Sequence, residues 1–160
     1  MKKALVICLF LIVCSAGEMM AQTQDQGNVR AHAFGNYGLR WKNFGTGVGL
    51  EYFFVDQFAI KPSYTRIFPR VGNASNFSMD LRYYVSDGPS QMYFMAGYSQ
   101  NWETPNTVGG PGVTRSFKGA NVGVGAYIRL VDWVGLSTEF RVQSQTPREA
   151  GFRFGLAFPL

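Results

Sequence analysis

Residues 151–160 alternate strictly between large apolar side chains and small or charged ones. A period of two is the pattern of a β-strand, because successive side chains point to opposite faces. Nothing in the printed sequence follows this strand to cover its apolar face. Such a face is costly in water but stable where a strand closes a barrel in lipid. The apolar positions are Phe152, Phe154, Leu156, Phe158 and Leu160.

The same alternation recurs along the chain, between segments rich in turn residues. The sequence contains 19 Gly, 14 Phe and 8 Tyr, and only 16% of its residues are charged. Recurrent turn residues between short alternating runs favour an all-β chain. We expect eight strands, at residues 28–40, 44–54, 58–68, 76–85, 91–102, 116–130, 134–142 and 151–160.

The connections between these strands alternate in length. Tight turns are expected at residues 55–57, 86–89 and 131–133, whereas longer loops are expected at 69–75, 103–114 and 143–149. The connection after the first strand is the exception, because only residues 41–43 separate the two strands. Barrels of bacterial outer membranes have short turns on the periplasmic side and longer loops outside. The sequence therefore predicts an eight-stranded antiparallel up-and-down transmembrane β-barrel over residues 28–160.

The N-terminus has the features of a signal for export. Lys2 and Lys3 precede an apolar run at residues 4–14, which is too short for a spanning helix. We expect a cleaved signal peptide at residues 1–21 and a polar leader at 22–27, with cleavage after Gly17 as the alternative. Lipidation at Cys14 is disfavoured by Val13, which stands where such signals have a small residue.

Removal of the signal peptide changes the composition. Both cysteines, Cys8 and Cys14, are lost, so the mature chain has no disulfide and no thiol ligand. Without Lys2, Lys3 and Glu18, the 15 basic and 10 acidic residues become 13 and 9, a formal charge of +4. These charges are dispersed, which argues against a nucleic-acid partner.

Alternation alone does not decide which face meets lipid, since a soluble lipocalin-like barrel that binds an apolar ligand inside shows the reverse arrangement. Rows of glycine on the polar face, at residues 45–49 and 119–125, favour the lumen of a narrow barrel, where large side chains do not fit. Charged residues on that face would have to pair and would plug the lumen. The expected charge network is Glu51, Lys61, Asp80, Arg82, Arg129, Glu139, Arg141 and Arg153.

The export signal, the strand count, the short inner turns and the terminal strand together resemble the small eight-stranded outer-membrane barrels, of the OmpA transmembrane domain and OmpX type. The terminal strand is similar to the one that the barrel assembly machinery reads in this family, although Leu160 stands where Phe or Trp is usual. The resemblance implies a monomer in the outer membrane, in contact with its lipid and lipopolysaccharide. It also implies a structural, adhesin-like or resistance-like role, without defining which one.

Enzymatic alternatives find little support in the residues. Lipid A-modifying barrels of this type need His and Ser, in one case at a His-x-Ser spacing, but the single histidine His32 is followed by Ala33 and Phe34. We expect no catalytic, cofactor or metal residues, since one histidine without cysteine is a poor metal site. A narrow pore is a further alternative to the plugged lumen. Arg66, on the lipid-facing side, is expected either to contact lipopolysaccharide phosphates or simply to extend toward the interface.

Overall fold

The structure is a computed structural model. It describes residues 24–69, 71–107, 110–145 and 148–160. The expected signal peptide, residues 1–21, lies outside the described residues, and of the polar leader only residues 24–27 are described. Within the described part of the chain, no helix is long and apolar enough to cross a membrane.

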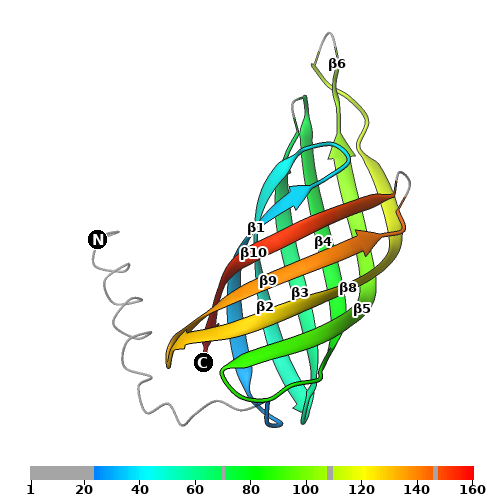
Figure 1. The fold of residues 1–160 in the computed structure, drawn as a ribbon. Helices are drawn as coiled ribbons and strands as arrows, with labels where there is room; N and C mark the ends of the chain where they lie inside the picture. Colours follow the sequence, from blue (N-terminus) through cyan, green and yellow to red (C-terminus); the bar gives the residue numbers. More distant parts are fainter. Residues whose placement is uncertain (1–23, 70, 108–109, 146–147) are drawn as a thin grey trace, which may run out of the picture.

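Eight antiparallel strands form one closed barrel, which confirms the predicted fold (Figure 1). The order around the barrel is β1-β10-β9-β8-β5-β4-β3-β2, so consecutive barrel strands are neighbours throughout. The strands are β1 (Val29–Gly38), β2 (Phe44–Val55), β3 (Phe58–Phe68), β4 (Asn73–Tyr84), β5 (Ser90–Thr104), β8 (Arg115–Val131), β9 (Val134–Gln143) and β10 (Glu149–Pro159).

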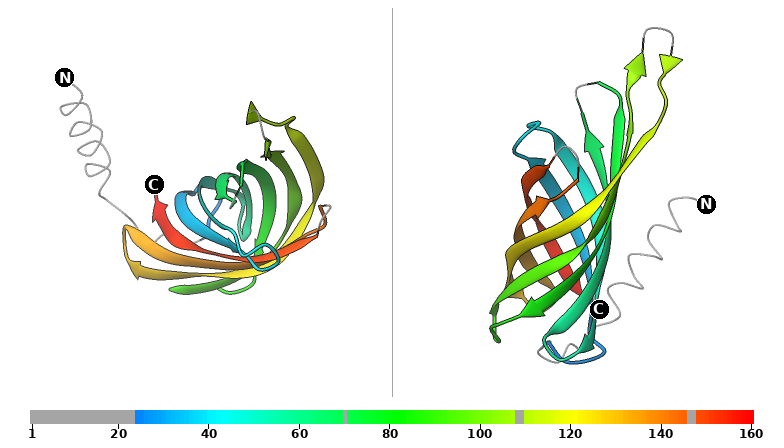
Figure 2. Two further views of the ribbon diagram at one scale, coloured as in Figure 1. Left: turned by 90° about the horizontal axis from the view of Figure 1, so that it is seen from above. Right: turned by 90° about the vertical axis from the view of Figure 1, so that its right-hand side faces the viewer.

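The expectation of an irregular loop at residues 103–114 is wrong. The ladder between β5 and β8 continues to the pair Glu103 and Arg115, and beyond it β6 (Asn106–Thr107) and β7 (Gly110–Pro111) form a second, two-stranded sheet. The amide of Gly112 donates to the carbonyl of Pro105 at 2.7 Å, which extends the antiparallel pairing past the barrel wall. The resulting hairpin rises beyond the other connections (Figure 2).

The two ends of the barrel differ in their connections. At one end, here called the turn end, lie residues 24–28, the connections 56–57, 85–89 and 132–133, and Leu160. At the other, the loop end, lie the connections 39–43, 69–72, 105–114 and 144–148. Figure 1 shows the loop end at the top, with the C-terminus at the bottom. The predicted asymmetry in length is present in part: two connections of the turn end have two residues each, but the connection 85–89 is as long as 39–43 and longer than 69–72.

The barrel closes where β10 pairs with β1. Nine residue pairs join the two strands, from Arg30 and Pro159 to Gly38 and Gly151. The amide of Leu160 extends the ladder by donating to the carbonyl of Val29 at 3.0 Å. Phe152, Phe154 and Leu156 point outward and are about half exposed. The last strand therefore lies where its apolar alternation predicts, as the closing strand of the wall.

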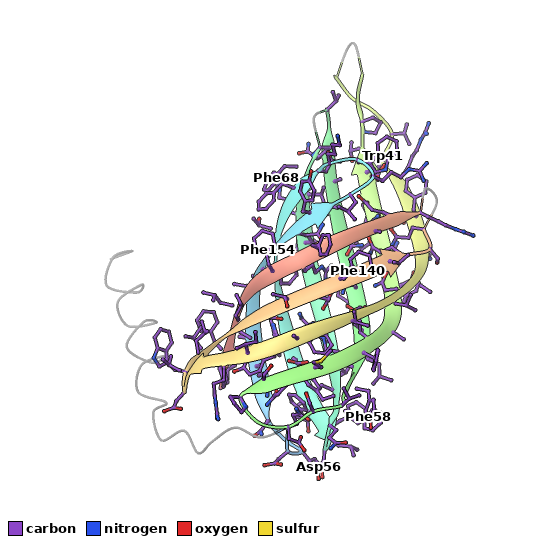
Figure 3. The ribbon with its side chains drawn as sticks, in the orientation of Figure 1. Trp41, Asp56, Phe58, Phe68, Phe140 and Phe154 are labelled. Atoms are coloured by element: carbon purple, nitrogen blue, oxygen red, sulfur yellow. The ribbon has the colours of Figure 1, made fainter. Side chains whose placement is uncertain are left out.

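The two faces of the wall are opposite in character. The outer face carries apolar side chains from every barrel strand, among them Leu50, Leu81 and Phe94. The buried side chains are mainly polar or charged, and Arg30, Arg82 and Arg141 are among the largest of them. In Figure 3, aromatic side chains lie toward both ends, with Trp41 and Phe68 at the loop end and Phe58 at the turn end. This is the inverse of a water-soluble protein, whose charges lie outside.

Glycines in the wall make room for large aromatic side chains in the lumen. A Cβ at Gly125 would lie 2.4 Å from the Tyr93 ring, and one at Gly135 would lie 2.3 Å from the Tyr127 ring. Tyr93 also packs in a buried cluster that contains Phe53, Ala59, Tyr84 and Met95. The glycine rows thus mark the lumen face, as the sequence predicts. The aromatic layer that they accommodate was not predicted.

Leu50→Lys tests which face of the wall meets lipid. Leu50 is 47% exposed on the outer face of β2, near the middle of the apolar band. A lysine at the bilayer midplane of such a barrel costs about 2–4 kcal/mol, and a lysine near the interface costs about 0–1 kcal/mol. We expect Leu50→Lys to reduce the folded fraction strongly in lipid vesicles, as measured by gel electrophoresis without heating. Thr46→Lys, on the same face of the same strand but closer to the loop end, is the control. Equal folding of both variants would contradict the assignment of the outer face to lipid.

Candidate functional site: a charged network in the barrel lumen

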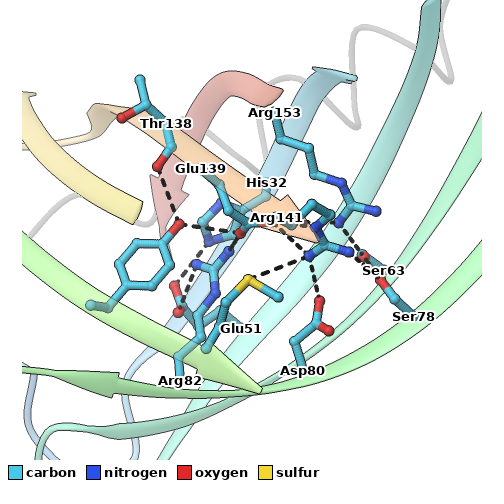
Figure 4. Close-up of polar contacts among 12 residues, drawn as sticks. His32, Glu51, Ser63, Ser78, Asp80, Arg82, Thr138, Glu139, Arg141 and Arg153 are labelled. Carbon is cyan, nitrogen blue, oxygen red and sulfur yellow. Dashed lines mark hydrogen bonds and ion pairs between the residues drawn. The ribbon is translucent and has the colours of Figure 1, made fainter. Parts of the chain in front are cut away.

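A chain of ion pairs crosses the lumen from β2 to β9 and back to β4. Arg82 donates from Nη1 to Glu51 Oε1 at 3.1 Å and from Nη2 to Glu139 Oε2 at 2.5 Å. Arg141 donates from Nη2 to Asp80 Oδ2 at 2.7 Å and lies 2.6 Å from Glu139 Oε1. All five side chains are at most 2% exposed. Figure 4 shows that Glu139 stands between the two guanidinium groups.

Barrel closure brings these residues together. Arg82 and Asp80 alternate with outward residues on β4, and Glu139 and Arg141 do the same on β9. Because two further strands separate β4 from β9 on one side of the barrel, the contacts between them are made across the lumen. The alternation of the sequence places each of these residues on the inner face, but only closure of the barrel brings them close enough to form ion pairs.

Two members of the cluster were missing from the predicted network. His32 Nε2 lies 2.9 Å from Glu51 Oε2, and Arg30 lies 4.0 Å from the same oxygen. Arg30 also donates to Gln91 Oε1 at 2.9 Å, and its guanidinium lies 4.3 Å from the centroid of the Tyr127 ring. The inward parity of Arg30 and His32 was visible in the sequence. Their contact with Glu51 depends on the register that pairs Arg30 with Glu51 across β1 and β2.

Two predicted cations lie beside the network rather than at its centre. Arg153 Nη1 is 4.0 Å from Glu139 and donates to the Ser63 hydroxyl at 3.2 Å. Lys61 Nζ lies 5.2 Å from the centroid of the Phe34 ring, and it forms no ion pair with any described residue. Cations stacked on an aromatic face gain a modest electrostatic attraction, which is larger away from water.

The prediction for Arg129 was wrong. Arg129 is half-buried near the turn end, where it pairs with Gly135 and the ladder shifts register before Val131. It takes part in none of the ion pairs of the lumen among the described residues. The reason is distance along the strand, since Arg129 lies four positions along β8 from Gly125, the residue that pairs with Glu139.

A layer of neutral polar side chains lies between the charges and the loop end. Asn121 connects the two, because its Nδ2 donates to Asp80 Oδ1 at 3.0 Å while its Oδ1 accepts from the Ser99 hydroxyl at 2.6 Å. Gln145 donates to Ser99 and accepts from Asn101, which in turn accepts from Asn76. No single-sequence pattern distinguished these residues from other small polar ones.

The charges in the lumen do not balance. The described lumen contains five cations, Arg30, Lys61, Arg82, Arg141 and Arg153, against three carboxylates, Glu51, Asp80 and Glu139. Three of the guanidinium groups, those of Arg30, Arg82 and Arg153, have a buried Nε that finds no hydrogen-bond partner among the described residues. The interior is therefore a positively charged, hydrogen-bonded filling.

The lumen histidine has a geometry unlike that of a general base next to a serine. The hydrogen bond of His32 goes to Glu51, and the hydroxyl groups of Ser63 and Ser78 lie 2.8 Å from each other. A group that acts on membrane lipid must be reachable from the bilayer, whereas His32 is 4% exposed and faces the lumen. In the part of the chain that the structure describes, no three His, Cys, Asp or Glu side chains are grouped as metal ligands.

The fold is that of known outer-membrane barrels. The structure superposes on the N-terminal β-barrel domain of Pseudomonas aeruginosa OprF with a TM-score of 0.72 and 22% identity, over 86% of this chain and 100% of that domain. The superposition on Neisserial surface protein A has a TM-score of 0.63 and 16% sequence identity, and it covers 82% of this chain and 94% of that protein. Ail of Yersinia pestis was solved with the heparin analogue sucrose octasulfate. Its superposition has a TM-score of 0.62 and 12% sequence identity, and it covers 84% of this chain and 100% of Ail. No family model and no curated protein matches the sequence.

Glu139→Gln is expected to destabilise the barrel strongly. The change removes the carboxylate that lies 2.5 Å from Arg82 and 2.6 Å from Arg141, and it leaves two guanidinium groups poorly compensated. Removing one partner of a buried pair costs about 3–5 kcal/mol. The measurement is the urea midpoint of the refolded barrel. The control is Glu103→Gln, an exposed residue at the loop end, for which the cost is expected to be below about 1 kcal/mol. If the two variants unfold at the same urea concentration, the network does not stabilise the barrel.

Proposed function

We propose that this chain is an integral protein of the bacterial outer membrane, a non-enzymatic barrel with a structural or surface-interaction role. The observation that carries the proposal is the inversion of its faces, with apolar side chains outside a closed wall and charges inside. A lipocalin-like barrel would need an apolar interior, whereas most buried residues here are polar or charged. The likeness to solved outer-membrane barrels supports the same location.

The proposed orientation follows from the two ends. Short turns and both ends of the described chain lie at the turn end, as they do on the periplasmic side of outer-membrane barrels. The signal peptide expected at residues 1–21 would bring the chain to that side. Insertion would then depend on the barrel assembly machinery and on the apolar closing strand. We expect a monomer, because the closed wall leaves no strand edge to pair.

The proposed role of the lumen network is to plug the barrel. Side chains fill the interior of an eight-stranded barrel, and here Arg82 connects carboxylates on opposite walls. The aromatic cluster toward the turn end and the amide layer toward the loop end occlude the lumen on both sides of the charges. On this proposal the lumen passes water at most.

The loop end has the charge expected of a surface that contacts anions. Six described cations lie there against two carboxylates, Glu103 and Glu149. Among the described residues, the turn end has one cation, Arg129, against four aspartates. The cations of the loop end are Arg40, Lys42, Arg66, Arg115, Lys118 and Arg148.

Two further features support a surface-interaction role. A cavity of about 310 Å³ at the loop end is lined in part by Trp41, Phe117 and Arg115. The structure of Ail with a sulfated sugar makes a polyanion a reasonable first ligand class to test.

Cell fractionation together with gel electrophoresis tests the location. We expect the protein in the outer-membrane fraction, as a compact band that runs faster unheated than boiled. The unheated shift depends on the closed barrel surviving in detergent, as its continuous ladder suggests. A chain that stays soluble without detergent and runs alike in both lanes would overturn the proposal, since its apolar face could not then be the outer one.

Bilayer recordings test the plug. We expect the refolded barrel to give no steady ionic current above that of a bilayer that received detergent alone, because the ion pairs of Arg82 and Arg141 cross the lumen. A stable, ohmic current proportional to the amount of inserted protein would contradict the plug while leaving the membrane location intact.

A further inference from the structure

A shallow groove lies on the outer wall of the barrel, at the loop end of β3, β4 and β5. Its cavity volume is about 150 Å³. Unlike the apolar wall below it, the groove is rich in polar side chains, which lie beside two aromatic ones. It is lined by Tyr64, Arg66, Asn73, Ala74, Ser75, Trp102 and Thr104.

The strand register explains the shape of the groove. Arg66 pairs with Ser75, and Ser75 pairs with Trp102, so the three residues form one outward-facing row across three strands. Neighbouring strands lie about 4.8 Å apart, so the backbones at Arg66 and Trp102 are about 10 Å apart. The small Ser75 is the floor between a guanidinium on one side and an indole on the other.

The groove lies where the apolar band of the wall ends. On β4 the outward residues are Tyr83, Leu81, Met79 and Phe77, followed toward the loop end by Ser75 and Asn73. From Tyr83 to Ser75 the strand rises about 27 Å, or about 21 Å along the barrel axis at a tilt of about 40°. The apolar band of such barrels is about 25 Å tall. With Tyr83 at one edge of the band, Ser75 lies about 4 Å inside the other edge, next to the headgroups of the leaflet that faces the loop end.

One cation lines the groove and a second lies near it. Arg66 forms no ion pair with any described residue. The next row toward the turn end runs from Tyr64 through Phe77 and Gln100 to Lys118, which is exposed. Arg66 thus lies at one side of the groove, and Lys118 lies beyond the other side on β8. The nearest acidic residue on β5, Glu103, belongs to the inward-facing set of that strand.

We propose that this groove binds the phosphorylated sugar headgroup of a glycolipid in the outer leaflet, of the lipopolysaccharide class. Arg66 binds the phosphate, because a guanidinium presents paired donors that match phosphate oxygens. Trp102 and Tyr64 flank the sugar at the depth where aromatic residues are enriched in membrane proteins. The side chains of Ser75, Asn73 and Thr104 provide hydrogen-bonding groups for its hydroxyls. This inference rests on the proposed membrane location.

Native mass spectrometry of the refolded barrel in detergent, titrated with bisphosphorylated lipid A, tests the site. We expect one tightly bound lipid for the wild type and about tenfold weaker binding for Arg66→Gln, because a charge-assisted contact is lost. Ser75→Phe keeps Arg66 but fills the floor of the groove, and it should weaken binding similarly. Arg40→Gln is the matched control, since Arg40 is also a cation of the loop end but donates to the carbonyl of Arg148 at 3.2 Å.

The outcomes separate the possible errors. Equal loss in Arg40→Gln and Arg66→Gln would overturn the site in favour of a diffuse attraction to the loop end. Phosphatidylglycerol bound as tightly as lipid A would overturn the assignment to a sugar headgroup, as would full competition by millimolar inorganic phosphate. Each variant is first checked for the compact unheated band. A wild-type chain without that band refutes the proposed membrane barrel, whereas a folded wild type that binds no lipid A refutes only the groove.

Discussion

Closure of the wall between β1 and β10 is the constraint on which the other features depend. Backbone amides and carbonyls without partners cost several kcal/mol each in hydrocarbon, so a sheet can lie in a membrane only when it has no edge. The nine pairs of this seam, with the last amide of Leu160, satisfy the two strands that would otherwise be edges. Without the seam, neither the apolar outer band nor the enclosed lumen exists.

Closure at eight strands also determines what the lumen can contain. An interior of this width has no room for bulk water, so its charges contact one another and the polar and aromatic side chains around them. Glu139 pairs with Arg82 across the lumen and with Arg141 on its own strand, and Glu51 is shared between Arg82 and His32. Large aromatic rings fit only beside glycines such as Gly125 and Gly135. The small residues of the wall and the large residues of the lumen are thus two parts of one packing arrangement.

The outer wall has two chemical zones. Over most of its height it offers only apolar contacts, which suit lipid chains but select no particular lipid. At the loop end of β3 to β5 the pattern changes over two rows: Tyr64, Phe77 and Gln100 are followed by Arg66, Ser75 and Trp102. Because Ser75 is small and lies between the larger Arg66 and Trp102, the wall has a groove there. A groove with a charged side chain can bind one kind of headgroup selectively. The strongly basic loop end would draw anionic lipids toward that wall.

The sequence by itself determined the strand count, the closing strand at residues 151–160 and the face on which each residue lies, because a period of two follows from local backbone geometry. It did not determine partners. Arg30 and His32 join Glu51 through the register of β1 and β2, whereas Arg129 shares the parity of the lumen charges yet lies too far along its strand to reach them. The hairpin of β6 and β7 was missed because its Gly- and Pro-rich residues have no alternation of their own. Contacts across the lumen, and the row that places Ser75 between Arg66 and Trp102, depend on strand register and barrel closure, which are long-range properties that no local pattern encodes.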